Sequence, residues 1–265
     1  MRKHFLIAIS LFALAGCSAL ERPHAAAVSD LAPTGRLRAA INLGNPVLAT
    51  RDASGQPQGV SVDLARELSR RLGVPVELIT FDAAGKVVEA GKTGAWDIAF
   101  VALDPARAAE IAQSPPYVAI EGAYLVRNNS KIQANDEVDR SGNRIVVARG
   151  SAYDLFLSRN LKQAQIVRTP TSRVVVDTFM AENLEVAAGV KQQLEADAKR
   201  VPGVRLLPGR FMVINQAMAS QRGREAGARY VREFIEEMKS SGFVARALER
   251  HRIEGAAVAP AGDPK

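Results

Sequence analysis

The sequence predicts an α/β protein that is divided into two lobes. Patterns typical of strands alternate with patterns typical of helices from about residue 36 to residue 253, and such alternation indicates α/β architecture. A polar stretch at 128–142 interrupts the alternation, which then restarts. The chain of 265 residues therefore has room for two α/β lobes of about 100 residues each, a usual size for a domain.

Short apolar runs bounded by Gly, Pro or polar residues predict the strands. They are Leu37–Asn42, Val76–Phe81, Trp96–Val101 and Gly122–Val126 in the first half, and Arg144–Ala148, Gln165–Arg168, Leu184–Ala188 and Phe211–Met218 in the second. Apolar residues three and four positions apart predict the helices. They are Val60–Leu72, Lys86–Lys92, Pro105–Ala112, Ala152–Leu161, Ser172–Glu182, Lys191–Lys199, Arg224–Ser240 and Phe243–Arg250.

Several of these helices have suitable residues at their ends. Gly73 follows the first helix and ends it, because glycine readily adopts the left-handed conformation of a helix terminus. Asp104 suits the N-cap position, and Pro105 suits the first helical position. Ser151, with Asp154 three residues later, resembles a capping box.

The rare residue types exclude several kinds of site. Cys17 is the only cysteine, so neither an intrachain disulfide nor a cysteine metal cluster can form. The three histidines, His4, His24 and His251, lie near the ends of the chain. This position argues against a Ser/His/Asp triad and against a histidine zinc site. We expect no cofactor and no metal.

The charge distribution does not indicate nucleic-acid binding. The formal net charge of +7 falls to +5 once residues 1–16, which contain Arg2 and Lys3 and no acids, are removed. No basic stripe interleaved with aromatic residues is visible, although nucleic-acid-binding proteins often have one. We therefore expect a basic solvated surface and no nucleic-acid partner.

The amino terminus is typical of a bacterial export signal. Met1–His4 is basic, and Phe5–Ala15 is apolar but too short to span a membrane, which needs about 20 residues. Leu14–Cys17 resembles the lipobox of bacterial lipoproteins, so residues 1–16 are predicted to be a signal peptide that ends before a lipid-anchored cysteine. The alternative is an ordinary signal cleaved within His24–Ala27, which would leave a soluble periplasmic protein.

Flexible segments are expected on both sides of the body. Residues 17–35 are small, polar and Pro-containing, which predicts a tether that carries the lipid at Cys17. Residues 254–265 have the composition of a flexible tail.

A series of short motifs resembles the pattern of a known family. The motifs are Gly44–Pro46, Gly59–Leu64, Trp96–Ala99, Asp104–Arg107, Ser114–Tyr117 and Arg149–Ser151. Their order and spacing resemble the family 3 extracellular solute-binding proteins, which are periplasmic receptors for polar amino acids and related small acids in ABC importers.

The resemblance implies a two-lobe, type II periplasmic-binding-protein-like fold with a central ligand cleft and two hinge strands. Lobe 1 would comprise 36–128 and 214–253, and lobe 2 would comprise 129–213. The hinges would lie near Val126–Asn129 and Phe211–Gln216, and closure would be a hinge motion. The resemblance also implies a periplasmic monomer that works with an ABC permease and ATPase complex and meets the membrane through its lipid anchor.

The resemblance assigns ligand contacts to both sides of the cleft. Arg107 takes the place of the arginine that grips the ligand carboxylate, because a guanidinium matches a carboxylate with two parallel donors. Ser151 and the backbone amides of Ala152 and Tyr153 begin the second-lobe helix, where free N–H groups attract anions. The alternatives are a surface arginine at 107, a simple N-cap at 151 and a packing role for Tyr153.

Two further positions belong to the predicted site. Asn45 lies in the loop at the mouth of the family's pocket. Asp104 matches a hydroxyl position in relatives, and its simplest alternative role is to cap its own helix.

The departures from the family pattern predict the class of ligand. Val190 takes the place of the aspartate that holds the ammonium group of an amino acid, and Val47 and Leu48 replace an aromatic residue of the first loop. An unpaired ammonium in a closed cleft costs several kcal/mol. We therefore expect a small carboxylate with an apolar or neutral body rather than an α-amino acid.

The leading functional hypothesis is a receptor that captures a small carboxylate for an ABC importer. One alternative is a periplasmic enzyme on the same fold, similar to cyclohexadienyl dehydratase. Such an enzyme needs an acid–base pair, and the sequence shows no convincing one; Glu185 is a weak candidate that more simply balances a charge in lobe 2. Another alternative is a ligand sensor for a separate signalling partner.

Overall fold

Strands from both halves of the chain join a single sheet in the computed structural model, which describes residues 25–262. The sheet has ten strands in the order β4-β1-β5-β11-β6-β9-β7-β8, with β10 and β12 also paired to β6. The strands are β1 (Leu37–Asn42), β4 (Val76–Phe81), β5 (Ile98–Ala102), β6 (Ile111–Arg127), β7 (Arg144–Ala148), β8 (Gln165–Thr169), β9 (Val186–Val190), β10 (Val204–Leu206), β11 (Met212–Gln221) and β12 (Ala257–Val258). A small hairpin of β2 (Thr50–Arg51) and β3 (Pro57–Gln58) stands apart from this sheet.

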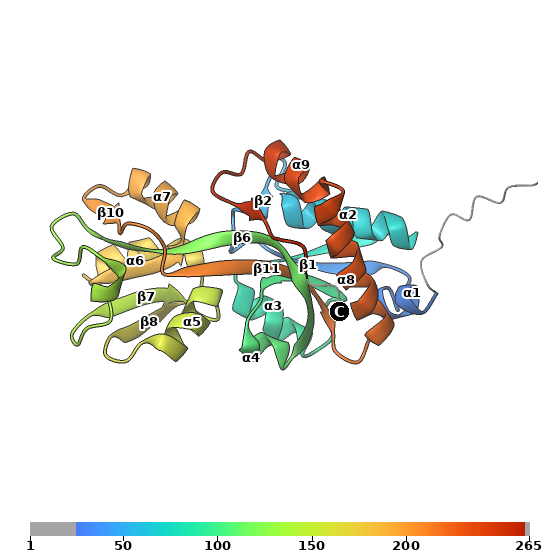
Figure 1. Ribbon diagram of the computed structural model, residues 1–265, viewed down its shortest axis with the longest axis horizontal. Helices are drawn as coiled ribbons and strands as arrows, with labels where there is room; N and C mark the ends of the chain where they lie inside the picture. Colours follow the sequence, from blue (N-terminus) through green and yellow to red (C-terminus); the bar gives the residue numbers. More distant parts are fainter. Residues whose placement is uncertain (1–24, 263–265) are drawn as a thin grey trace, which may run out of the picture.

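Helices lie on both faces of the sheet (Figure 1). They are α1 (Ala25–Leu31), α2 (Val60–Leu72), α3 (Ala84–Gly91), α4 (Pro105–Ala108), α5 (Ala152–Asn160), α6 (Val175–Ala181), α7 (Lys191–Arg200), α8 (Glu225–Ser240) and α9 (Phe243–Arg250), with 3₁₀ turns at Asn135–Glu137 and Ser172–Val174. The α/β fold class predicted from the sequence is confirmed.

The sheet divides into two lobes that share two long strands. The first lobe contains β1, β4 and β5, and the second contains β7, β8 and β9; within each lobe these strands are parallel. The long strands β6 and β11 run from one lobe into the other (Figure 1). Along β6, residues up to Gly122 pair with β11, and Gly122–Leu125 pair with β9. This change of partner lies a few residues before Val126–Asn129, where a hinge was expected.

The predicted helix from Pro105 to Ala112 is wrong in length. Helix α4 ends at Ala108, and β6 begins at Ile111, which pairs with Gln221 of β11. The prolines within β6 disguise the strand, because proline cannot donate to a strand ladder. The Ser114 hydroxyl, which precedes them, accepts the Met218 N–H at 3.1 Å and so replaces a ladder bond beside a register shift.

Both predicted flexible segments contain ordered structure. Within 17–35, helix α1 packs on α8; the Gly227 N–H donates to the Asp30 carboxylate at 2.9 Å, and a Cβ at Gly227 would come within 2.9 Å of Asp30. Within 254–265, β12 pairs with Val118 and Ala119 of β6. Polar, small-residue composition conceals both, since each is held by partners far away in the chain.

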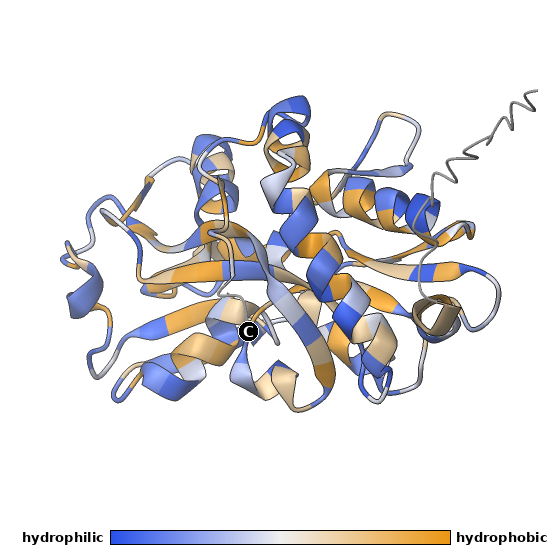
Figure 2. Ribbon diagram, turned by 45° about the vertical axis from the view of Figure 1, so that its right-hand side comes forward, coloured by the Kyte–Doolittle hydropathy of each residue, from blue (hydrophilic) through white to orange (hydrophobic). Residues whose placement is uncertain are grey.

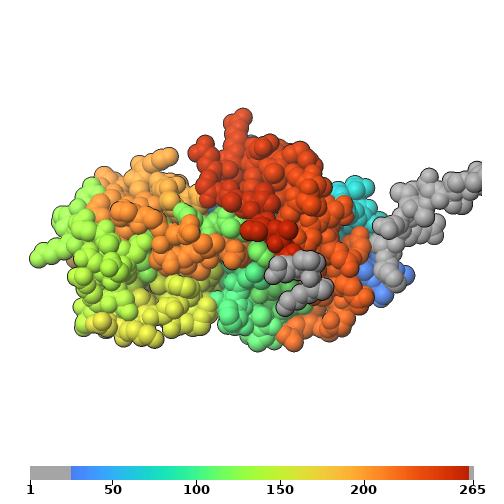
Figure 3. Space-filling view, viewed as in Figure 1, coloured from blue at the N-terminus to red at the C-terminus, as the bar shows by residue number. Residues whose placement is uncertain are grey.

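The apolar residues of the strands and the inner helix faces form the core. Figure 2 shows apolar colour along the strands and alternating colours on the helices, as expected for amphipathic helices. Trp96, which is fully buried, donates its indole N–H to the Val87 carbonyl at 2.8 Å and packs α3 onto its face of the sheet. In the space-filling view, second-lobe atoms in yellow lie against first-lobe atoms in green, so the two lobes are in contact on this face (Figure 3).

Candidate functional site

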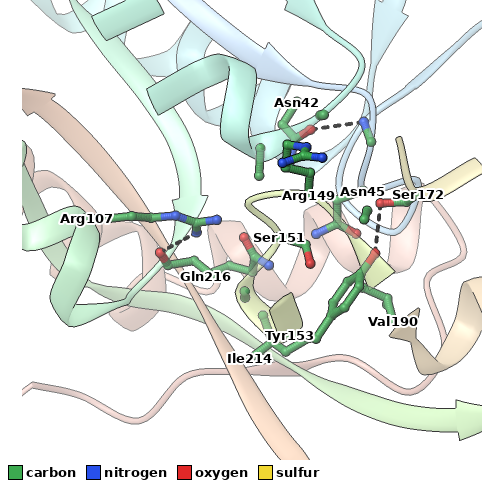
Figure 4. A pocket seen from close by; sticks show the side chains of 16 residues that line it. Asn42, Asn45, Arg107, Arg149, Ser151, Tyr153, Ser172, Val190, Ile214 and Gln216 are labelled. Atoms are coloured by element: carbon green, nitrogen blue, oxygen red, sulfur yellow. Dashed lines mark hydrogen bonds between the residues drawn. The ribbon is translucent and has the colours of Figure 1, made fainter. Parts of the chain in front are cut away.

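A cavity lies between the two lobes, where the strands β1, β5, β7 and β9 end. The carboxyl ends of parallel strands are the usual place for ligands in α/β proteins. The residues that line the cavity are Asn42, Gly44, Asn45, Ala83, Ala84, Ala102, Arg107, Ala148, Arg149, Ser151, Ala152, Tyr153, Ser172, Val190, Ile214 and Gln216 (Figure 4).

Arg107 provides a buried cation at this cavity. Its side chain, only 2% exposed, donates from Nη1 to the Ala102 carbonyl and from Nη2 to the Gly150 carbonyl of the other lobe, both at 2.8 Å. Within residues 25–262, its Nε has no hydrogen-bond partner and no carboxylate lies within ion-pair distance of the guanidinium. Burial lowers the pKa of Arg107 to about 10, an effect that Asp104 partly offsets. The side chain is therefore a cation at neutral pH without a counter-ion in the described chain.

Helix α5 begins on the opposite side of the cavity. Ser151 caps it, since its hydroxyl accepts the Asp154 N–H at 3.0 Å. The N–H groups of Ala152 and Tyr153 have no acceptor in the part of the chain that the structure describes. Free amides at a helix amino terminus, where the dipole is positive, favour an anion.

Tyr153 and Asn45 add neutral polar groups to the same cavity. The Tyr153 hydroxyl lies 3.0 Å from the Ser172 hydroxyl, and burial raises its pKa, so it is neutral at pH 7. Figure 4 shows this pair at the side of the cavity near Val190. Asn45 is buried, and its Oδ1 has no partner among the described residues.

Asp104 does not line the cavity. Its Oδ1 accepts the Ala106 N–H at 2.9 Å, and its two oxygens accept Nη1 and Nη2 of Arg159 at 3.1 and 2.7 Å. Arg159 belongs to α5, so Asp104 caps α4 and pairs with the other lobe. The prediction that Asp104 contacts ligand is not supported by this position. The predicted anchor Cys17 lies outside the described residues.

Among the residues that the structure describes, the lining contains two arginines and no acidic residue. Val190 lines the cavity, as its place in the motif predicted, whereas the next residue turns away because the Lys191 Nζ pairs with Glu121 at 2.9 Å. Glu185 lies at the opposite end of β9, where it pairs with Arg144 at 2.9 Å. Among the described residues, no group of three or more His, Cys, Asp or Glu side chains is placed to hold a metal ion.

Several lining residues were absent from the predicted site. They are Asn42, Arg149, Ser172, Ile214 and Gln216. Asn42 and Arg149 end or follow strands β1 and β7, so their position at the carboxyl ends of predicted strands was a signal available in the sequence. Ile214 and Gln216 come from β11, and only the pairing of β11 with β5 and β6 brings them to the cavity.

A family profile matches most of the chain. Residues 37–253 match the profile of the bacterial extracellular solute-binding proteins, family 3. The chain belongs to this family. The resemblance seen in the motifs is confirmed, and so is the two-lobe binding-protein fold. Family 3 proteins bind small solutes outside the cytoplasm, and members of the family work with ABC permeases.

Solved structures agree with the fold. The solute receptor for L-cysteine of Neisseria gonorrhoeae has a TM-score of 0.74 at 22% identity, over 86% of this chain and 95% of that chain. The cysteine-binding protein of Campylobacter jejuni has a TM-score of 0.72 at 17% identity, over 84% and 91%. The ancestral amino acid-binding protein AncCDT-1, a precursor of cyclohexadienyl dehydratase, has a TM-score of 0.71 at 20% identity, over 84% and 97%.

A search among curated proteins found no match. No helix within residues 25–262 has the length and apolar character needed to cross a membrane.

Proposed function

We propose that this family 3 protein is the receptor of an ABC importer and captures a small carboxylate between its lobes. The buried guanidinium of Arg107 carries this proposal, because among the described residues it has no counter-ion and its Nε has no acceptor, and a buried cation is costly without an anion. The free amides of Ala152 and Tyr153 approach from the other lobe. A carboxylate held by both sides would favour the closed arrangement of the lobes.

The same cavity disfavours an α-amino acid. An ammonium group needs a carboxylate or several strong acceptors once water is excluded, and Val190 offers neither. The free Oδ1 of Asn45 supplies one neutral acceptor, which replaces only part of the lost hydration. The L-cysteine receptor and the cysteine-binding protein of similar fold differ from this chain at roughly four positions in five, so they do not fix its ligand.

A matched pair of ligands tests this proposal. Pentanoate and norvaline differ only in the ammonium group, and both are titrated calorimetrically into the purified protein. We expect the simple carboxylate to bind at least about tenfold more tightly, equivalent to 1–2 kcal/mol. Tight binding of the amino acid alone would contradict the proposal.

The residues that line the cavity suit a receptor better than an enzyme. One protein of similar fold is a precursor of an enzyme, cyclohexadienyl dehydratase. Dehydration needs a general acid or base within reach of the substrate. The lining residues include no carboxyl and no imidazole group. We therefore expect no dehydratase turnover, measured by absorbance with cyclohexadienyl acids at high protein concentration.

We also propose that the mature protein begins at an acylated Cys17. This proposal rests on Leu14–Cys17 and on the position of the sole cysteine. Cys17→Ser is expected to release the protein from the membrane fraction. Mass spectrometry that finds a free amino terminus near Ala25–Ala27 would contradict it.

A further inference from the structure

The cavity contains more positive charge than one carboxylate can balance. Arg107 lies on the first-lobe side, and Arg149 follows strand β7 of the second lobe; both line the cavity, and Figure 4 shows them entering from different sides. We propose, on the basis of the proposed carboxylate receptor, that the ligand is a short dicarboxylate, with one carboxylate on Arg107 and the second on Arg149.

The backbone around Arg149 is held firmly. Its N–H donates to the Thr169 carbonyl at 2.9 Å. Gly150 adopts a positive φ of 67°, and a Cβ at this position would come within 2.8 Å of the Gly85 Cα in α3. This close backbone contact brings the second-lobe loop against the start of α3 in the first lobe, and Arg149 and Asn42 both line the cavity there (Figure 4).

The Arg149 guanidinium has no acidic partner among the described residues. Within residues 25–262, it makes no hydrogen bond and no ion pair, although it lies at the cavity. The acid near this end of α3, Asp82, pairs with Lys86 at 2.8 Å. Arg149 is solvent-exposed, so its guanidinium is accessible to an anion from solution.

Two helix amino termini add to the positive field. The first N–H groups of α3, which follow the extended N-cap Ala83, have no side-chain cap and no acceptor in the described chain. Ala83 and Ala84 line the cavity opposite the start of α5. Each helix amino terminus behaves as a fraction of a positive charge, so two cations and two helix ends converge on a cavity without an acid.

This arrangement discriminates between anions by number and spacing of charges. A monocarboxylate would pair with Arg107 and leave the exposed Arg149 guanidinium without an anion. A dicarboxylate supplies an acceptor for each guanidinium, and its neutral carbon chain lies beside neutral groups such as Asn45, Ser151 and Gln216. Phosphate carries its charge on a single centre and therefore serves as the compact-anion comparison in the test.

The test compares dicarboxylates with monocarboxylates of equal carbon number by calorimetry: malonate, succinate and glutarate against propionate, butyrate and pentanoate. We expect at least one dicarboxylate to bind about tenfold or more tightly than its matched monocarboxylate. Arg149→Gln should bring this ratio close to one. Arg140→Gln, an exposed second-lobe arginine that pairs with Glu137 away from the cavity, should leave the ratio unchanged. The ratio should also fall as salt is added, because screening weakens the second, partly exposed charge pair more than the buried one.

The outcomes separate this inference from the proposed function. If monocarboxylates bind through Arg107 but dicarboxylates gain nothing and Arg149→Gln leaves the ratio unchanged, the dicarboxylate inference is wrong and the carboxylate receptor stands. If phosphate binds with the same dependence on Arg149, the ligand class is a compact anion and the inference is also wrong. If no mono- or dicarboxylate binds, the proposed function itself fails.

Discussion

The arginines at the amino ends of the parallel strands, here called the amino edge of the sheet, differ in their partners from those at the carboxyl ends, here called the carboxyl edge. At the amino edge of the first lobe, Arg38 donates from its backbone N–H and Nε to Asp97 Oδ2, both at 3.0 Å, and from Nη2 to Oδ1 at 2.8 Å. At the amino edge of the second lobe, Arg144 makes the same three contacts to Glu185, at 2.8, 2.9 and 2.9 Å. In each lobe, therefore, one arginine and one acid fasten two neighbouring parallel strands.

At the carboxyl edge, Arg107 and Arg149 have no such acid in the described chain. Local sequence does not reveal this difference, because all four arginines lie at or next to strand ends or in the turns that follow. The structure separates them by partner: a bidentate carboxylate makes an arginine part of the scaffold, and its absence leaves a guanidinium available for an anion from solution. Four substitutions test this contrast.

The largest effect is expected from Arg107→Met. Loss of one partner from a buried charge pair costs about 2–5 kcal/mol, so affinity for a carboxylate should fall between thirtyfold and several thousandfold. The ligand-free variant should retain its melting temperature, because removal of a desolvated cation offsets the loss of its hydrogen bonds to Ala102 and Gly150. Calorimetry and thermal unfolding measure the two effects. An unchanged dissociation constant would show that Arg107 is scaffold.

The next effect should be the reverse, with stability lost and binding kept. Asp97 is fully buried and serves both Arg38 and Arg224, whose Nη1 lies 2.9 Å from Oδ1. Asp97→Ala is expected to lower the free energy of unfolding by about 2–4 kcal/mol, since it leaves the backbone N–H and two cations without their acceptor. Urea unfolding measures this.

Glu77→Ala is the matched control at the same edge. It breaks an exposed pair with Arg36 at 3.5 Å, which is worth about 0–1 kcal/mol. Equal losses of stability for Asp97→Ala and Glu77→Ala would remove the distinction between the edges.

A smaller effect is expected from the ion pair that joins the lobes at the carboxyl edge. Arg159→Ala removes the partner of Asp104 across the cleft; because the Arg159 side chain is 44% exposed, the pair is worth about 1 kcal/mol. We expect carboxylate affinity to fall about three- to tenfold. The ligand-free protein should become more extended, as measured by small-angle scattering. Arg200→Ala, which removes pairs to Asp177 and Asp197 inside one lobe, should leave both measurements unchanged.

The smallest effect concerns how the stability from the Arg144–Glu185 pair depends on pH. Hydrogen bonds from Arg144 lower the pKa of Glu185 in the folded protein. The stabilisation is present above the unfolded pKa, near 4.5, and is lost as pH falls through the lowered folded pKa. Glu185→Gln should therefore cost about 0.5–1 kcal/mol at pH 7, because the pair is about one-third exposed. This difference should shrink as urea unfolding is repeated at successively lower pH below 4.5. A difference independent of pH would show that packing, not charge, fastens these strands.

Periodicity predicted most of the fold because local pattern and final position agree there. Strands β1, β4 and β7 and helices α2 and α9 have the predicted bounds. The errors fall where partners are remote: β6 is continuous across Pro115 and Pro116 because β11 pairs with it, and β12 is a strand only against β6.

The site could be predicted in part for the same reason. The order of the motifs predicted that Asn45, Arg107 and the start of α5 lie at one site, and all three line the cavity. The partner of a charge is set by tertiary structure: Asp104 meets Arg159, 55 residues away, which no local pattern reveals. The role of Asp104 therefore required the structure.

The position of β11 also has a consequence for the order of folding. Residues 98–102 of the first lobe pair with residues 216–220, so the sheet of the first lobe stays incomplete until nearly the whole chain has been made. Contacts between segments this far apart in sequence slow folding. A nascent chain of this kind cannot complete its first domain while the ribosome is still translating the second. Residues 1–16 are predicted to be an export signal, and such a delay would keep an exported chain unfolded and able to pass through a translocation channel until its carboxyl-terminal fifth is available.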